Sequence, residues 1–177
     1  LIGAAACWIA RRDGPHWLGH AAAAASVAVV AAWLFEVPVL VAERAWELAL
    51  VVSALALVYH VFFELERARC ARESAGGEHA ASFAAAGLAL VAALAPLHGA
   101  PISIAPILVA VLVPCALLVR QSWCASRKWL APVSGALSGL ALALYELRHV
   151  GVESGLQLSP QAFLALEVRH HARIEVA

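Results

Sequence analysis

The chain has 177 residues, of which 63% are hydrophobic and 14% are charged, and its formal net charge is zero with neutral histidine. A soluble domain of this length has too little interior to bury so many apolar side chains, so the composition excludes an ordinary soluble fold and favours an integral membrane protein. Because the charge is balanced, no basic field favours binding to nucleic acid, and we expect no partner of that class.

Five segments are long and apolar enough to form spanning helices, which need about 20 such residues. They cover roughly 17–35, 39–63, 80–97, 102–119 and 129–147, and a weaker sixth at about 156–168 contains Gln157, Gln161 and Glu167. The breaks between them carry charges, prolines or glycines, as loops do. We predict an all-α polytopic transmembrane bundle of about six to seven spans, forming one domain over residues 1–177.

The start of the chain and two of its prolines also bear on this helical pattern. The sequence begins at Leu1 and contains no methionine, so we expect it to be a fragment of a longer product. Its first ten residues are apolar but too short to span, and we expect them to end an earlier helix. Pro106 and Pro114 lie inside the fourth segment, where membrane helices tolerate a kink.

Lysine and arginine are unequally divided between the two sides of the predicted membrane. One side carries eight of them and the other carries two, Arg44 and Arg148. The eight are Arg11, Arg12, Arg67, Arg69, Arg72, Arg120, Arg127 and Lys128. Cytoplasmic loops carry the excess of positive residues, so we predict that this side faces the cytoplasm. We expect the membrane to be a bacterial inner membrane and its lipids to be the partners of the chain. Tryptophans near the segment ends support these boundaries, since such rings favour the interface.

The second segment ends with a histidine and a carboxylate one helical turn apart, in SALALVYHVFFELE at 53–66. Helical residues three, four and seven apart share a face, so Ser53, His60 and Glu64 line one stripe, with Ser53 about 10 Å deeper than His60. Ionisable groups at membrane depth usually face the bundle interior. Imidazole and carboxylate suit zinc, which in catalytic sites has three protein ligands and an open position for an activated water.

Each of these residues also has a simpler structural interpretation. A histidine at a helix end often lies with its polar edge among the headgroups. Glu64 and Glu66 lie close to Arg67 and Arg69 and fit the start of a solvated loop. Ser53 fits a small packing residue in an apolar helix. The zinc hypothesis therefore depends on several polar side chains gathering at one membrane face, where His20, His60, Glu78, His79, His170 and His171 are all predicted to lie.

The order of these motifs resembles a known family. HWLGH ends at His20, SALALVYH ends at His60, an arginine-containing loop follows, and EHAASFAAAGLALVAALAPL begins at Glu78. This order resembles the haemolysin-III and progestin/adiponectin-receptor group, which is related to the alkaline ceramidases in a superfamily of seven-helix membrane hydrolases. The resemblance covers roughly residues 16–97. It implies a zinc held by histidines, with a serine and an aspartate near the metal-bound water.

The resemblance assigns roles to single positions of this chain. His60 would be a zinc ligand, Glu78 stands where the family has aspartate, and Ser53 would be the serine, although it lies further from the histidine than the family's spacing. LEVRH, at 166–170, resembles the family's last-helix motif but lacks its first histidine, so only His170 matches.

The first functional hypothesis is a zinc-dependent hydrolase acting on a lipid amide at the cytoplasmic membrane face. His60 and His170 would hold the metal with a third histidine that spacing leaves unassigned, and His79 is a candidate for it. The zinc-bound water would attack the amide carbonyl, with Glu78 or Glu64 as general base and Ser53 orienting the water or the oxyanion.

Two further hypotheses remain open. The chain fits a non-enzymatic polytopic membrane protein, either a transporter or a structural subunit, in which the histidines are interfacial. It also fits a haem protein in which His60 and His79 face each other across adjacent helices; the sequence contains no CxxCH, so that haem would be bound non-covalently.

Overall fold

The computed structural model describes residues 16–36, 42–69, 76–98, 103–124 and 127–153. Within these ranges the regular structure is helical. The elements are α2 (His16–Glu36), α3 (Ala42–Arg69), α4 (Gly76–Leu94) continued by the 3₁₀ turn η1 (Ala95–His98), α5 (Ile104–Cys124) and α6 (Leu130–Glu153). The described residues form five α-helices, and each of them is long and apolar enough to cross a membrane. The predicted all-α class is confirmed; the sixth predicted segment, 156–168, lies outside the described residues.

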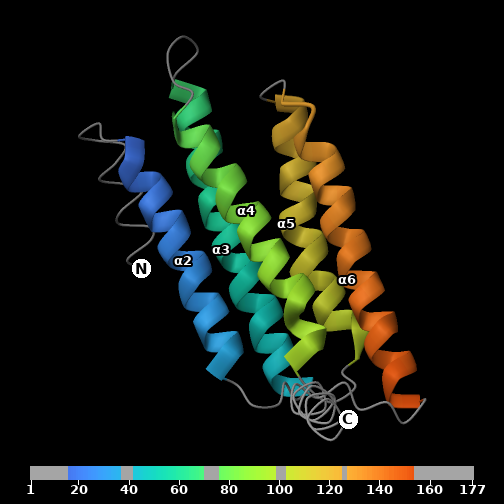
Figure 1. Cartoon of the computed structure of the whole chain (residues 1–177). Coiled ribbons are helices and arrows are strands. Elements are labelled where there is room, and N and C mark those ends of the chain that lie inside the picture. The colour runs from blue at the N-terminus through green and yellow to red at the C-terminus, as the bar shows by residue number, and fades with distance from the viewer. Residues whose placement is uncertain (1–15, 37–41, 70–75, 99–102, 125–126, 154–177) are drawn as a thin grey trace, which may run out of the picture.

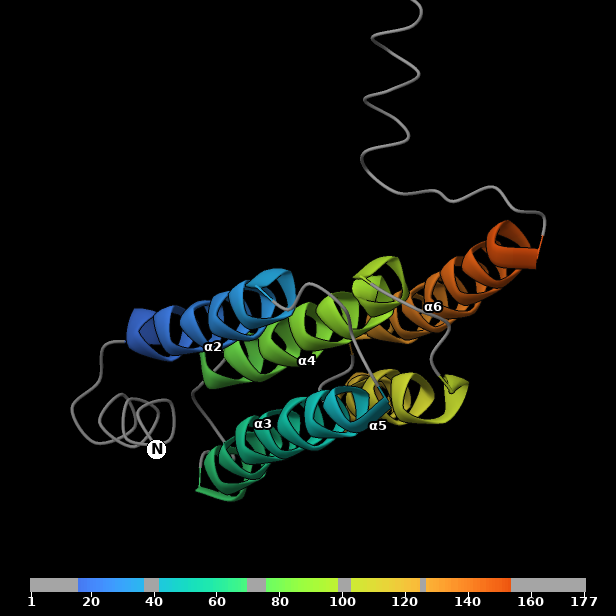
Figure 2. The same cartoon turned by 90° about the horizontal axis from the view of Figure 1, so that it is seen from below.

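The helices run alternately up and down and form two layers (Figures 1 and 2). Helices α2, α4 and α6 lie side by side in one layer, and α3 and α5 form the other, with α4 packed against α2, α3, α5 and α6. The bundle therefore has two distinct ends. We call the end where α2, α4 and α6 begin and α3 and α5 finish the His60 end, and the opposite end the Glu47 end.

Tryptophans mark both ends of the bundle. Trp17 and Trp123 lie at the His60 end and Trp46 lies at the Glu47 end, and all three are exposed. Exposed indole rings at both limits of an apolar helix bundle are typical of the two interfaces of a membrane. Their positions agree with the predicted aromatic belts.

Three predicted segments end too early: α3 continues past 63 to Arg69, α6 continues past 147 to Glu153, and α5 continues past 119. The fourth segment was expected to end at 119, with a break from Arg120 to Lys128, but α5 continues to Cys124. Arg120 is exposed and its guanidinium pairs with Glu64 of α3, so the charge is accommodated on the helix without ending it. The additional turn carries Gln121 and Ser122 into buried positions.

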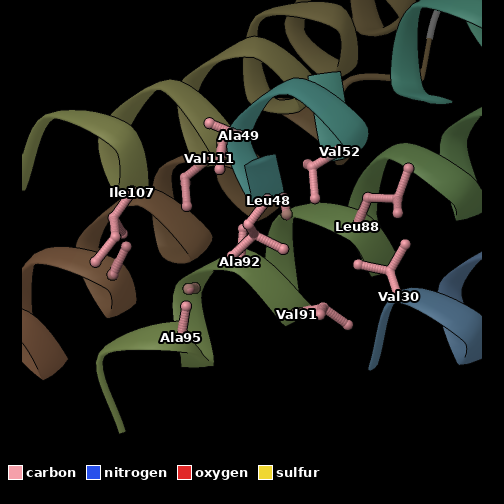
Figure 3. Packing of buried hydrophobic residues seen from close by; sticks show 14 of the residues in the cluster. Val30, Leu48, Ala49, Val52, Leu88, Val91, Ala92, Ala95, Ile107 and Val111 are labelled. Carbon is pink, nitrogen blue, oxygen red and sulfur yellow. The ribbon is translucent and has the colours of Figure 1, made fainter. Parts of the chain in front are cut away.

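The core surrounds α4, whose small side chains let four neighbours approach it. Eight of its 19 residues are alanine. Small residues at helix interfaces bring backbones close together, which is how membrane helices gain packing energy without a hydrophobic driving force. The largest cluster of buried residues joins all five helices of the described chain; Figure 3 shows Val30, Leu48, Val52, Leu88 and Val111 among its members.

Helix α2 approaches α4 closely at two glycines. A Cβ atom placed on Gly87 would lie 2.8 Å from Cγ2 and 3.1 Å from Cγ1 of Val27, and one placed on Gly19 would lie 3.5 Å from Cβ of Ala80. These contacts hold α2 parallel to α4 along its length. In contrast, α2 makes few contacts with α3.

The two prolines of the fourth predicted segment have different positions in α5. Pro106 lies in the first helical turn, where its missing N–H has no intrahelical acceptor to lose. Pro114 lies in the helix interior and is buried. It leaves the carbonyl of Ala110 without the usual i+4 donor, as membrane helices tolerate.

Candidate functional site

Three buried polar side chains from three helices meet at the His60 end. Ser82 on α4 donates a hydrogen bond from Oγ to Oε1 of Gln121 on α5 at 2.9 Å. Nε2 of the same Gln121 lies 3.4 Å from Nδ1 of His60 on α3. All three residues are buried, so these contacts replace the water that each polar group would otherwise need. The chain of contacts links α4, α5 and α3.

The direction of these hydrogen bonds fixes the proton on His60. Because Oε1 of Gln121 accepts from Ser82, its amide nitrogen is the group facing His60, and an amide nitrogen can only donate. Nδ1 of His60 is therefore the acceptor, and the neutral ring carries its proton on Nε2. Nε2 lies 3.5 Å from Oε1 of Glu64, one turn further along α3.

Glu64 joins this buried chain to the surface. Its Oε1 accepts from Nε and Nη2 of Arg120, each at 2.8 Å, and its side chain is about one third exposed. The Arg120 side chain is 59% exposed and reaches the bundle end. A continuous set of contacts thus runs from the buried Ser82, through Gln121, His60 and Glu64, to a solvent-accessible guanidinium; we call it the His60 network.

The ring of His60 is also held from the side. It stacks on Phe63, with ring centroids 5.7 Å apart and an interplanar angle of 25°. Phe63 is buried in a second cluster with Tyr59, Ala23, Ala81 and Ala84. The imidazole is therefore fixed both by its polar partners and by aromatic packing.

Tyr59, immediately before His60, connects α3 to α2. Ser26 donates from Oγ to the carbonyl of Ala22 at 2.9 Å, as serines in helices often do. The phenol oxygen of Tyr59 lies 2.9 Å from Ser26 Oγ, so the phenol donates in this pair. Ser26 and Tyr59 supply a polar link between α2 and α3, two helices that otherwise have few contacts.

A second polar group at this end contains the predicted ligand His79. The ring of His79, on α4, lies 6.4 Å from the ring of His20 on α2, measured between centroids. Arg127, which precedes α6, places Nη1 3.2 Å from Nδ1 and Nη2 3.2 Å from Nε2 of the same ring. In these contacts His79 lies beside His20 and Arg127, whereas His60 lies beside Gln121 and Glu64, and the haem hypothesis stays a prediction.

Ser53 lies on the same stripe of α3 as His60 and Glu64, but it does not share their polar contacts. Its Oγ is buried and lacks a hydrogen-bond partner among the residues that the structure describes. A buried hydroxyl without a partner has lost its hydration without gaining a hydrogen bond, which costs free energy. Its role as the predicted serine stays a prediction.

The remaining predicted residues are less fully described. Glu78 lies in the first turn of α4, but its side chain is outside the description, and His170 lies outside the described ranges. Among the side chains that the structure describes, His, Cys, Asp and Glu form no group of three that could hold a metal. Zinc requires three protein ligands in a catalytic site. His60 and Glu64 alone do not meet that requirement.

Sequence reasoning missed Ser82, Gln121 and Arg120. Gln121 was assigned to a break between spans, yet it follows Leu118 by three residues and Pro114 by seven, and both of these are buried. This spacing places Gln121 on the inward face of α5. Extending the helical pattern past Arg120 would have identified it.

No known protein-family pattern matches this chain, and neither curated proteins nor solved structures include a significant match to it.

Proposed function

We propose that this integral membrane protein is a non-enzymatic transporter in which the His60 network exchanges protons between the bundle interior and one membrane face. The observation that carries the proposal is the unbroken series of contacts from Ser82 through Gln121, His60 and Glu64 to Arg120. Ionisable groups in membrane helices are costly, and chains of histidine and carboxylate within a bundle are a recurring means of moving protons.

Each member of the network has a part in this exchange. Glu64 accepts hydrogen bonds from Arg120 and is about one third exposed, so it connects the network to water at the bundle end. His60 passes its Nε2 proton to Glu64 and takes another at Nδ1 from the bundle interior, as the amide of Gln121 turns its oxygen towards the ring. Gln121 and Ser82 reorient their hydrogen bonds when the ring charge changes. A change at the membrane face is thereby transmitted to contacts between α3, α4 and α5.

The test is proton flux into liposomes that contain the purified full chain and an internal pH-sensitive dye. An imposed pH difference should collapse faster than in protein-free liposomes, and His60→Ala should return the rate to the protein-free level. His98→Ala is the matched control, since His98 lies at the Glu47 end against Phe35. A wild-type rate equal to that of protein-free liposomes, or an undiminished rate in His60→Ala, would contradict the proposal.

The second candidate is the zinc-dependent lipid amidohydrolase that the motif order suggests. Its support is the juxtaposition of an imidazole and a carboxylate at a span end, with Nε2 of His60 and Oε1 of Glu64 3.5 Å apart. In that function His60, His79 and His170 are the proposed ligands, and Ser53, Glu64 and Glu78 are the proposed catalytic groups.

Metal content distinguishes the two candidates. Mass spectrometry of the detergent-purified chain should find about one zinc per chain if the hydrolase proposal holds, and less in His60→Ala than in His98→Ala. Proton flux without bound zinc would favour the transporter. Bound zinc that disappears with His60 would favour the hydrolase and direct assays to lipid amides.

A further inference from the structure

An apolar groove lies between α2 and α3 in the half of the bundle towards the Glu47 end. It encloses about 380 Å³ and is lined by Val29, Val30 and Trp33 of α2 and by Glu47 and Val51 of α3. It exists because α2 packs along α4 and hardly touches α3. Figure 2, seen from below, shows α2 and α3 in separate layers, with α4 beside both. The volume falls within the usual range for small-molecule sites.

The lining combines three chemical features that suit one class of ligand. Three valines supply apolar contact. Trp33 supplies the aromatic face that attracts cations most strongly. Glu47 adds one acidic residue to an otherwise apolar lining, so a negative charge lies at the groove. A large organic cation with apolar substituents would be complementary to all three.

The charges around the groove favour the same ligand. Among the residues that the structure describes, Glu47 pairs with Arg44, one turn earlier on α3, at 3.5 Å, and both side chains are more than half exposed. An exposed pair of this kind contributes little, about 0–1 kcal/mol, so Arg44 competes weakly for the carboxylate. Glu43 begins the same helix and Glu36 ends α2. The end of α2 and the first turns of α3 thus carry three carboxylates, Glu36, Glu43 and Glu47, and one cation, Arg44, which disfavours an anionic headgroup.

We propose that this groove binds a lipophilic organic cation that enters from the membrane. Its charge would lie between Glu47 and the face of Trp33, and its apolar substituents would contact Val29, Val30 and Val51. The site lies in a different half of the bundle from the His60 network. Because binding can be measured without transport, the inference does not depend on the proposed proton exchange.

Tetraphenylphosphonium is a suitable probe, and tetraphenylborate has nearly the same shape with the opposite charge. We expect equilibrium dialysis of the detergent-purified full chain to detect saturable binding of the cation and much weaker binding of the anion. Glu47→Gln should lower the affinity for the cation about tenfold, since it removes the carboxylate contact, and Trp33→Leu should lower that affinity severalfold. Glu43→Gln removes the same charge outside the lining and should leave the affinity within about twofold.

A further variant keeps the proposal falsifiable if Glu47→Gln or Trp33→Leu fails to fold. Arg44→Gln removes the cation that competes for Glu47 and lies on an exposed surface, so it should strengthen binding of tetraphenylphosphonium. Equal binding of the cation and the anion would identify the groove as an apolar contact for lipid chains and overturn the proposal. So would an affinity that is unchanged in both Glu47→Gln and Arg44→Gln.

Discussion

Helices α4 and α6 have similar compositions and opposite surroundings. Both are apolar, both contain several alanines and glycines, and they run parallel in the same layer of the bundle (Figure 1). Yet 67% of the spanning window of α4 is buried inside the protein, against 17% for α6. One helix forms the centre of the packing and the other forms its edge.

The same residue types therefore have different roles on the two helices. Gly87 of α4 lies against Val27, whereas a Cβ on Gly135 or Gly139 of α6 would meet no atom within 4 Å. Ser82 of α4 bonds across to Gln121, whereas Ser138 of α6 bonds to the carbonyl of Ser134 on its own helix at 3.0 Å. Composition does not separate these cases; the position of each helix in the bundle does.

The largest effect of this difference is expected at Gly87. Gly87→Ala places a methyl group 2.8 Å and 3.1 Å from the two Cγ atoms of Val27. A valine in a helix has one strongly preferred rotamer, so it cannot turn away and the two backbones must separate. Overpacking of this kind costs about 1–3 kcal/mol. Unfolding of the purified protein by increasing mole fraction of SDS in mixed micelles would measure the loss.

The double variant Val27→Ala/Gly87→Ala tests the cause. Removing the two Cγ atoms makes room for the added methyl group, so the double variant should recover most of the stability lost in Gly87→Ala. If the double variant is no more stable than Gly87→Ala, contact with Val27 is not the source of the loss, and the central role assigned to this part of α4 would be wrong.

An intermediate effect is expected for the two serines. Ser82→Ala leaves Oε1 of the buried Gln121 without its donor, and we expect a loss of about 1 kcal/mol in the free energy of unfolding. Ser138→Ala is the matched control, because its hydroxyl donates to the backbone of its own helix and has only the weakly bonding thiol of Cys115 as a partner on another helix, so the change should cost a few tenths of a kcal/mol or less.

The same SDS titration compares the two serine variants. Equal losses for Ser82→Ala and Ser138→Ala would mean that the bond between α4 and α5 adds nothing beyond a local helix contact. The hydrogen bond between Ser82 and Gln121 would then not support the role of the His60 network as a link between helices.

The sequence predicted the helices well because their signal is local. A run of about 20 apolar residues needs no knowledge of its neighbours, and five such runs coincide with the apolar spans of α2 to α6 within a few residues, with the end of α5 furthest from its predicted position. The end of α5 was missed since Arg120 was interpreted alone. Its acceptor Glu64 is 56 residues away in the chain, so no local pattern indicates that this charge is paired.

The candidate site was predictable only in part, for the same reason. Helical spacing placed His60 and Glu64 on one face, and the structure brings Nε2 of one to 3.5 Å from Oε1 of the other. The partners that orient His60 come from α4 and α5, and which side chains of those helices face α3 depends on how the helices are rotated and packed. Ser82 and Gln121 look unremarkable in sequence, and Ser53, which shares the stripe, gains no hydrogen-bond partner among the described residues.

The smallest effect, and one of opposite sign, is expected at Gly139. Alanine is favoured over glycine in a helix by roughly 0.5–1 kcal/mol, chiefly because glycine loses more backbone freedom on folding. A Cβ at Gly139 meets no atom within 4 Å, so no clash offsets this gain, and Gly139→Ala should raise the free energy of unfolding by about 0.5 kcal/mol in the SDS titration. Gly87→Ala makes the same chemical change on the central helix and should shift the transition in the other direction. A loss of stability in Gly139→Ala would mean that this face of α6 is covered by another helix in the purified protein, and α6 would then belong with α4 as a packed element instead of forming the edge of the bundle.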